Sequence, residues 1–335
     1  MRKLFLLVAN PTQMINAIEA RHFYSNSFSQ FQLVVFSDSL NYQKQVLSMA
    51  DESWDKLVYH PKGSGKWNVL RSILAKRDFI RLVLKKAQQG DALMIGNIHH
   101  YGCCSLADVW RDIGDLYAMD DGLGTVNWDI QLRDEKTWTP KTSKGWRGRL
   151  ERWILGIPKI ELSNLNFFSV YPLSHFNQSV TNNFGLISKS FVGKKYNDAV
   201  VYFLEQPLVE LGILSQKDYD CAIGKIISHY QEEGLEFKIV THRASHLKRK
   251  SHDVEYLSLD GPVEWEMRDW DVLPRKVATF YSSGAYHLSK MSQGDMIAEY
   301  WQILDDSKEI AIQPQLMKWL SVHAGRQMSI LNVAI

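Results

Sequence analysis

Short apolar runs alternate with segments of helical periodicity along most of this chain, and this alternation sets its fold class. In the first half, runs typical of buried strands occupy residues 4–9, 31–37, 56–59, 92–98 and 116–119. Apolar residues at helical spacing lie between them, at 13–23, 69–89 and 106–113. Short apolar strands separated by helices predict a parallel sheet that is covered on both faces.

The alternation restarts after a polar stretch near residues 184–197. Strands are predicted at 199–204, 237–240, 254–259, 276–281 and 309–312, and helices at 217–233, 293–304 and 316–324. The chain therefore predicts an α/β fold with two Rossmann-like domains that face each other across a cleft. We place the N-terminal domain at 1–190 and the C-terminal domain at 191–310. A C-terminal helix is expected at 311–335, and packing back on the N-terminal domain is one arrangement for it.

Composition narrows the class of protein. The chain has 335 residues, a net charge of +2 and 45% apolar residues, which suits a globular protein with two cores. Its three cysteines show no disulfide framework, and no Cys/His spacing resembles a zinc site, so we expect a reduced, cytoplasmic protein. The run at 4–9 is too short for a signal peptide, and no stretch reaches the roughly 20 apolar residues that cross a bilayer. The near-neutral charge argues against a nucleic-acid partner.

Basic and apolar residues interleave at helical spacing over 141–155. The basic residues are Lys141, Lys144, Arg147, Arg149 and Arg152, and the apolar ones are Trp146, Leu150, Trp153, Ile154 and Leu155. A stretch of this kind can lie on an anionic membrane surface, which predicts peripheral contact with a membrane. A solvated helix that packs by its Trp face is the alternative.

Two acids and a glycine, Asp120-Asp121-Gly122, directly follow the apolar run at 116–119. Adjacent carboxylates at the exit of a buried strand form an electrostatically costly pair, and the glycine lets the backbone turn sharply and a ligand come close. The combination suits a general base at the mouth of a cleft. An ordinary turn is the alternative, because Asp and Gly are common turn residues.

Polar residues also follow two predicted strands of the second half. Thr241-His242-Arg243 comes after 237–240, and Ser282-Ser283-Gly284 comes after 276–281. Ligands of open α/β sheets bind at the carboxyl ends of the strands. A histidine beside an arginine suits a site that receives a phosphate, and hydroxyls at a helix N-terminus suit an anion. Plain helix capping by the serines and a solvated loop after the histidine are the alternatives.

The order of these motifs resembles that of the bacterial GT-B sialyltransferases, the lipooligosaccharide sialyltransferase and polysialyltransferase type of glycosyltransferase family 52. That family has an acidic pair with a glycine, then a His-Pro, and then a Ser-Ser or Ser-Thr pair. Asp120-Asp121-Gly122 matches the first motif and Ser282-Ser283 the third, whereas His242 is followed by Arg243 in place of proline. Two more stretches are similar: Asn10-Pro11-Thr12-Gln13 with Asn16 and Glu19, and Phe203-Leu204-Glu205-Gln206-Pro207.

The resemblance implies a GT-B fold and an inverting transfer of sialic acid from CMP-sialic acid to a glycan hydroxyl, with no metal and no other cofactor. It assigns the general base, which takes the proton of the acceptor hydroxyl, to Asp120. His242 is the acid, and Ser282 and Ser283 bind the phosphate of the departing CMP. The acceptor is expected to be a lipid-linked glycan at the cytoplasmic face of the inner membrane.

Further site residues are predicted around these motifs. On the donor side they are Asn10, Gly122, Gln206, Arg243 and Glu264. On the acceptor or sugar side they are Asn97, His99 and Asp121, and Asp121 is expected to tune the base and hold the turn.

Three other functions remain open. The donor could be another CMP-activated nonulosonic acid, such as Kdo or a legionaminic-type sugar. The chain could be a GT-B transferase for a UDP- or GDP-sugar. It could also be a non-catalytic nucleotide-sugar-binding protein, in which Arg243 marks a lost activity.

Overall fold

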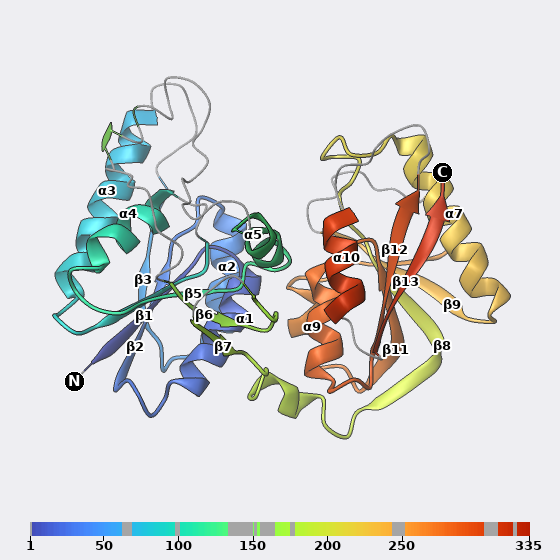
Figure 1. Ribbon diagram of the computed structural model, residues 1–335, viewed down its shortest axis with the longest axis horizontal. Coiled ribbons are helices and arrows are strands. Elements are labelled where there is room, and N and C mark those ends of the chain that lie inside the picture. Colours follow the sequence, from blue (N-terminus) through green and yellow to red (C-terminus); the bar gives the residue numbers. More distant parts are fainter. Residues whose placement is uncertain are drawn as a thin grey trace. The chain divides into compact units, whose positions relative to one another are not determined.

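The computed structural model describes residues 2–61, 69–97, 101–132, 150, 153–154, 165–174, 178–242, 252–304, 314–323 and 327–335. The chain divides into two compact units, Met1–Asn182 and Asn183–Ile335. Each unit is a parallel sheet with helices on both faces (Figure 1), as the alternation of the sequence predicts. The division after Asn182 comes slightly before the boundary expected at 190.

The first unit holds a seven-stranded sheet in the order β3-β2-β1-β4-β5-β6-β7. Its elements are β1 (Lys3–Val8), α1 (Pro11–Phe23), β2 (Gln30–Val35), α2 (Leu40–Met49), β3 (Asp55–Val58), α3 (Val69–Lys86), β4 (Ala92–Ile95), α4 (Tyr101–Trp110), β5 (Leu116–Met119), α5 (Gly124–Leu132), β6 (Asn166–Ser169) and β7 (Gln178–Thr181). Helices α3 and α4 cover one face, where Phe79, Val83 and Trp110 pack with Phe5 in one core.

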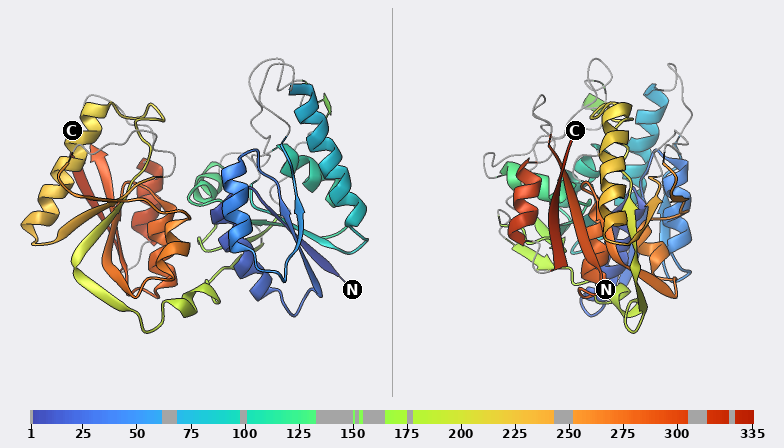
Figure 2. Two further views of the ribbon diagram at one scale, coloured as in Figure 1. Left: turned by 180° about the vertical axis from the view of Figure 1, so that it is seen from behind. Right: turned by 90° about the vertical axis from the view of Figure 1, so that its right-hand side faces the viewer.

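The second unit holds a six-stranded sheet in the order β10-β9-β8-β11-β12-β13. Its elements are η3 (Ile187–Ser190), β8 (Lys195–Leu204), α7 (Gln216–Glu232), β9 (Glu236–Val240), β10 (Glu255–Leu257), α8 (Val263–Met267), β11 (Val272–Thr279), α9 (Ser283–Met291), β12 (Ile297–Leu304), α10 (Pro314–His323) and β13 (Met328–Ala334). Helix α7 covers one face of this sheet, and α9 and α10 cover the other (Figure 2).

All described strand pairs in both sheets are parallel. The inner strands are buried on both faces, which is why they read as continuous apolar runs: β4 is buried along its whole length, and β1 from Leu4 onward. Parallel strands also collect their carboxyl ends at one edge of each sheet, and that edge is where the polar motifs of the sequence lie.

One helix prediction in the second half is wrong, and another is right only in part. A helix is expected over residues 293–304, but Ile297–Leu304 is strand β12, between β11 and β13. A strand buried on both faces carries a continuous apolar run, which periodicity alone does not distinguish from a buried helix. The break falls at Gln293 and Gly294, whose positive φ angles of 54° and 93° end α9.

The expected helix at 311–335 is present only in part. Pro314–His323 forms α10, but Met328–Ala334 forms β13, which pairs with β12 over its whole length. This last strand belongs to the second sheet because its backbone hydrogen bonds are made there. The short strand predicted at 309–312 lies outside the described residues. Helices α2 and α5 and strands β6 and β7 were not predicted.

Candidate functional site

At the carboxyl edge of the first sheet, Asp120 directly follows β5 and is fully buried. Its Oδ1 accepts a hydrogen bond from Ser169 Oγ at 2.6 Å, and its Oδ2 accepts one from the backbone N–H of Val170 at 2.7 Å. Ser169 ends β6, the neighbouring strand. The backbone pairing of β5 with β6 ends at Met119 and Phe168, and the Asp120 side chain joins the two segments just beyond that point.

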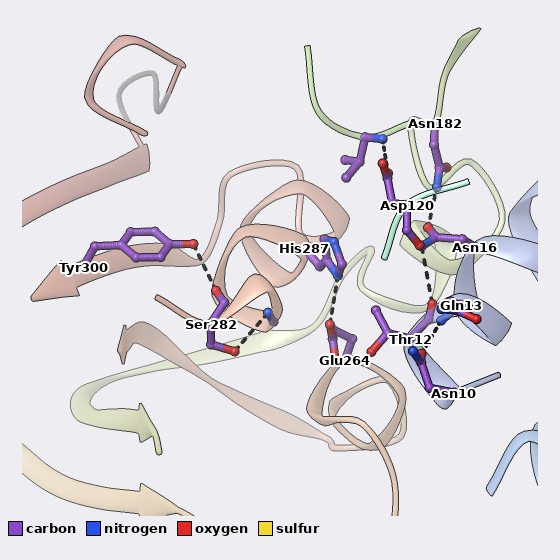
Figure 3. A network of polar contacts seen from close by, with 12 residues as sticks. Asn10, Thr12, Gln13, Asn16, Asp120, Asn182, Glu264, Ser282, His287 and Tyr300 are labelled. Carbon is purple, nitrogen blue, oxygen red and sulfur yellow. Dashed lines mark hydrogen bonds and ion pairs between the residues drawn. The ribbon is translucent and has the colours of Figure 1, made fainter. Parts of the chain in front are cut away.

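Two buried asparagines extend this polar cluster (Figure 3). Asn16 of α1 donates from Nδ2 to the carbonyl oxygen of Asp120 at 3.1 Å. Asn182, just beyond β7, donates from Nδ2 to Asn16 Oδ1 at 3.0 Å. Helix α1 and the ends of β5, β6 and β7 are thus joined by buried hydrogen bonds, which favours one fixed arrangement of this edge.

Asp121 lies in a different environment, because it is half-buried and turned toward the end of β1. Its Oδ1 accepts hydrogen bonds from Asn10 Nδ2 at 3.0 Å and from Gln13 Nε2 at 2.8 Å. Asn10 is the N-cap of α1 and accepts from the backbone N–H of Gln13 at 3.0 Å. The backbone N–H of Asp121 donates to Thr125 Oγ1 at 2.9 Å.

Two glycines make room for this arrangement. Gly122 has a φ of +63°, the left-handed region that favours glycine, and it turns the chain from β5 into α5. Gly96 follows β4, and a Cβ added there would lie 2.6 Å from Gln13 Oε1. That oxygen accepts from the backbone N–H of Ala9 at 2.7 Å. Gly96 therefore admits the side chain that orients Asp121.

At the carboxyl edge of the second sheet, His242 follows β9 and is half-buried. Its backbone N–H donates to Glu205 Oε2 at 3.0 Å, and Tyr219 Oη donates to Glu205 Oε1 at 3.3 Å. Glu205 follows β8 and is itself buried. A buried carboxylate thus holds the backbone that carries the imidazole.

Ser282 is the N-cap of α9, and its Oγ accepts from the backbone N–H of Gly284 at 3.2 Å. Tyr300 Oη donates to its carbonyl oxygen at 3.3 Å, and burial raises the pKa of Tyr300 far above its usual value, so the phenol stays a neutral donor. The preceding turn is held by Gln206, whose Oε1 accepts from the backbone N–H of Tyr281 at 2.7 Å. Ser283 is the first residue of α9 and is half-buried.

Glu264 pairs with a histidine that no sequence motif marks. Its Oε1 lies 2.9 Å from His287 Nδ1, with exposed fractions of 4% and 0% for the two residues. Glu264 belongs to α8 and His287 to α9, so the pair joins the two helices (Figure 3).

The structure therefore groups the predicted residues unevenly. It brings Asp121 and Asn10 into contact, and it joins Gln206 to Tyr281, the residue before Ser282. Asn97 follows β4 and is half-buried. His99 and Arg243 lie outside the described residues. Gly96, Ser169, Asn182 and His287 were missed, because each is an isolated residue in an ordinary sequence context.

Three further observations concern the described residues alone. The described residues include three of the stretch at 141–155, namely Leu150, Trp153 and Ile154. Among them, Trp153 is 81% exposed. No described helix combines the length and the apolar character that a membrane crossing requires. Within the same ranges, no group of three or more His, Cys, Asp or Glu side chains is placed to hold a metal ion.

No protein-family model matches the chain, and no curated protein matches it in sequence. Solved structures match its fold. The UDP-GlcNAc 2-epimerase of Methanocaldococcus jannaschii, in complex with UDP-GlcNAc and UDP, aligns with a TM-score of 0.54 and 10% identity over 98% of this chain and 89% of its own. MnaA of S. aureus, in a co-structure with UDP, aligns with a TM-score of 0.50 and 11% identity over 90% of this chain and 80% of its own.

MurG of Acinetobacter baumannii also aligns, with a TM-score of 0.43 and 8% identity over 99% of this chain and 85% of its own. None of these three is described as a sialyltransferase. At such identities the likeness concerns the fold alone. The chain accordingly has the two Rossmann-like α/β domains of the GT-B fold, a fold found in proteins solved with UDP and a UDP-sugar.

Proposed function

We propose that the protein is a glycosyltransferase that takes its sugar from a nucleotide-activated donor. The observation that carries this proposal is the polar set at the carboxyl edge of the second sheet. His242 follows β9, Gln206 follows β8, and Ser282 and Ser283 follow β11, and these three strands are neighbours in the sheet. This edge is where open α/β sheets bind their ligands.

The chemistry of these groups fits the phosphate of a nucleotide. The N-terminus of α9 offers backbone N–H groups and a helix dipole, and Ser282 and Ser283 add hydroxyls. When the glycosidic bond to the donor breaks, the leaving phosphate gains negative charge. An imidazole at His242 can donate a proton or a hydrogen bond to it, and fixed hydroxyls stabilise it without reorganisation.

The first unit supplies a candidate for the other half of the reaction. An acceptor hydroxyl attacks more readily when a carboxylate takes its proton, and Asp120 and Asp121 follow β5 at the carboxyl edge of that sheet. A glycan is the expected acceptor. A lipid-linked glycan at a membrane surface remains our hypothesis for it, motivated by the basic stretch at 141–155 and its exposed Trp153.

Two donor classes are supported by different observations. The order of Asp120-Asp121-Gly122, His242 and Ser282-Ser283 favours CMP-sialic acid or another CMP-activated nonulosonic acid. The fold comparisons favour a UDP-sugar, because the M. jannaschii and S. aureus structures were both solved with UDP. The comparisons give the UDP-sugar the broader support, since neither of these two structures involves CMP.

A donor screen tests the proposal. The protein is incubated with CMP-sialic acid, CMP-Kdo, UDP-GlcNAc or a GDP-sugar, with and without a panel of glycan acceptors, and the released nucleotide and the glycan product are quantified. Release of one nucleotide together with a glycosylated acceptor supports transfer and identifies the donor. Conversion of UDP-GlcNAc into its 2-epimer without an acceptor would overturn transfer, and binding without turnover would leave a nucleotide-sugar-binding protein.

Two histidine variants make the screen specific to the second unit. His242→Ala should lower turnover about 10²–10⁴-fold, the usual contribution of a general acid. His22→Ala is the matched control, because His22 is exposed on α1 and belongs to no part of the site. If the two variants turn over equally fast, His242 is not the acid.

A further inference from the structure

The two adjacent acids after β5 have different surroundings. Asp120 is 0% exposed, and each of its carboxylate oxygens accepts a hydrogen bond from the interior, from Ser169 Oγ at 2.6 Å and from Val170 N at 2.7 Å. A general base must come within hydrogen-bond reach of the proton that it removes. An acceptor hydroxyl cannot reach Asp120 unless these buried bonds break.

Asp121 meets the requirement better. It is half-buried, so that part of its surface reaches solvent. Two neutral amides hold its Oδ1 from the side of β1 and α1, Asn10 Nδ2 at 3.0 Å and Gln13 Nε2 at 2.8 Å. The bond from its backbone N–H to Thr125 Oγ1 fixes the start of the turn at Gly122. The two amides therefore orient the carboxylate without closing it off from a substrate.

We propose that Asp121 is the catalytic base and that Asp120 is a positioning residue. The inference rests on the proposed function and departs from the assignment that the motif resemblance gives. In the step, the acceptor hydroxyl oxygen forms a bond to the anomeric carbon of the donor sugar, and its proton passes to the Asp121 carboxylate. The bond from that carbon to the phosphate oxygen breaks, and its electron pair leaves with the nucleotide.

Asp120 acts through the backbone in this arrangement. Its side chain ties the end of β5 to β6, and its carbonyl oxygen accepts from Asn16 of α1. The peptide that follows carries Asp121. Asp120 accepts from Ser169 of β6 and Asp121 accepts from Asn10 at the start of α1, so that fixing Asp120 toward Ser169 holds in place the peptide that carries Asp121.

The experiment compares four variants with the donor that supports turnover: Asp121→Asn, Asp121→Ala, Asp120→Ala and Asp112→Asn. Asp112→Asn is the control, because Asp112 is an acid beyond α4, outside both sites. For each protein, kcat, the melting temperature and the dissociation constant of the nucleotide are measured. Turnover of the two alanine variants is then measured again with increasing formate, a small carboxylate that can replace a missing base only where solvent reaches.

Asp121→Asn keeps an oxygen that can accept from Asn10 and Gln13 but no longer takes a proton. We expect kcat to fall about 10²–10⁴-fold while the melting temperature and nucleotide affinity stay at the wild-type values. Formate should restore part of the turnover of Asp121→Ala and none of that of Asp120→Ala, which should also melt at a lower temperature.

Near wild-type kcat in Asp121→Asn, or rescue by formate of Asp120→Ala instead of Asp121→Ala, overturns the assignment while leaving the transferase function intact. A wild-type protein that turns over no donor overturns the proposed function and this inference with it. Should Asp120→Ala fail to fold, Ser169→Ala removes one of the hydrogen bonds of Asp120 and keeps both acids, and a fall in its kcat as large as that of Asp121→Asn at an unchanged melting temperature would count against Asp121.

Discussion

Oε1 of Glu264 lies 2.9 Å from Nδ1 of His287, and this contact joins α8 to α9 in the interior of the second unit. The ring of Phe184 packs against His287 with 5.4 Å between the ring centroids. Glu264 was predicted to bind the donor nucleotide, and its role in donor binding stays a prediction. Its contact with His287 makes the position of α8 depend on α9, the helix that Ser282 caps.

Replacing His287 with alanine should strongly destabilise the protein. The Glu264 carboxylate would stay buried without its partner, so its desolvation would no longer be offset. Removing one partner of a buried pair lowers the free energy of unfolding by about 3–5 kcal/mol. Urea unfolding gives the free energy, with His22→Ala as the control, because an exposed histidine should change it by less than about 0.5 kcal/mol. A loss below about 1 kcal/mol in His287→Ala would show that the pair is not stabilising.

Gly96→Ala should lower both stability and kcat although it replaces neither Asp120 nor Asp121. The added Cβ would lie 2.6 Å from Gln13 Oε1, so Gln13 must move and give up its bonds to Ala9 and Asp121. We expect a loss of about 1–3 kcal/mol in stability, as for other overpacked sites, together with lower kcat. Gly185→Ala is the matched control, because no atom of the described residues lies within 4 Å of a Cβ added there. Equal effects of the two substitutions on kcat would contradict the role of Gly96.

The fold was largely predictable because the inner strands are buried on both faces and each carries its own apolar run. The same property explains the failure at β12. Tyr300 and Trp301 are both buried although they are consecutive, so the strand shows no alternation. Helix α5 has only nine residues and follows Gly122 closely, and β6 has four, so both are too short to show a clear period.

The place of the candidate residues at strand ends was predictable, and their contacts were less so. Strand ends marked Asp120, His242 and Ser282, because a parallel sheet collects its carboxyl ends at one edge. The direction of each side chain was not encoded in the motif. Which acid turns inward depends on Ser169, which comes 49 residues after Asp120. The partner of Glu264 likewise depends on how α8 meets α9.

Tyr281 should make stability fall at alkaline pH. Burial raises its pKa from 10.0 to about 12. Between these values the folded protein keeps the phenolic proton while the unfolded chain loses it, so the unfolded state binds fewer protons and stability decreases as pH rises. Tyr281→Phe removes this contribution, and its urea midpoint should decline less steeply between about pH 10 and about pH 12 than that of the wild type. A difference in urea midpoint between the two proteins that does not change with pH would refute the raised pKa of Tyr281.

The Ser282 side chain should contribute both to helix stability and to donor binding. Ser282→Ala removes the hydroxyl that accepts from Gly284 N at 3.2 Å and caps α9, which should cost about 1 kcal/mol. The same hydroxyl is one of the groups proposed to meet the phosphate, so the dissociation constant of the donor nucleotide should rise about fivefold to tenfold, the equivalent of one hydrogen bond. Urea unfolding and calorimetric titration with the nucleotide measure the two effects.

Ser215→Ala separates these effects. Ser215 caps α7 in the same way, accepting from Asp218 N at 3.1 Å, but it precedes the helix on the other face of the second sheet and belongs to no strand end of the site. Its loss should lower stability by a similar amount, about 1 kcal/mol, and leave nucleotide affinity unchanged. If both variants bind the nucleotide as the wild type does, Ser282 serves only as a cap, and the phosphate must be held by other groups.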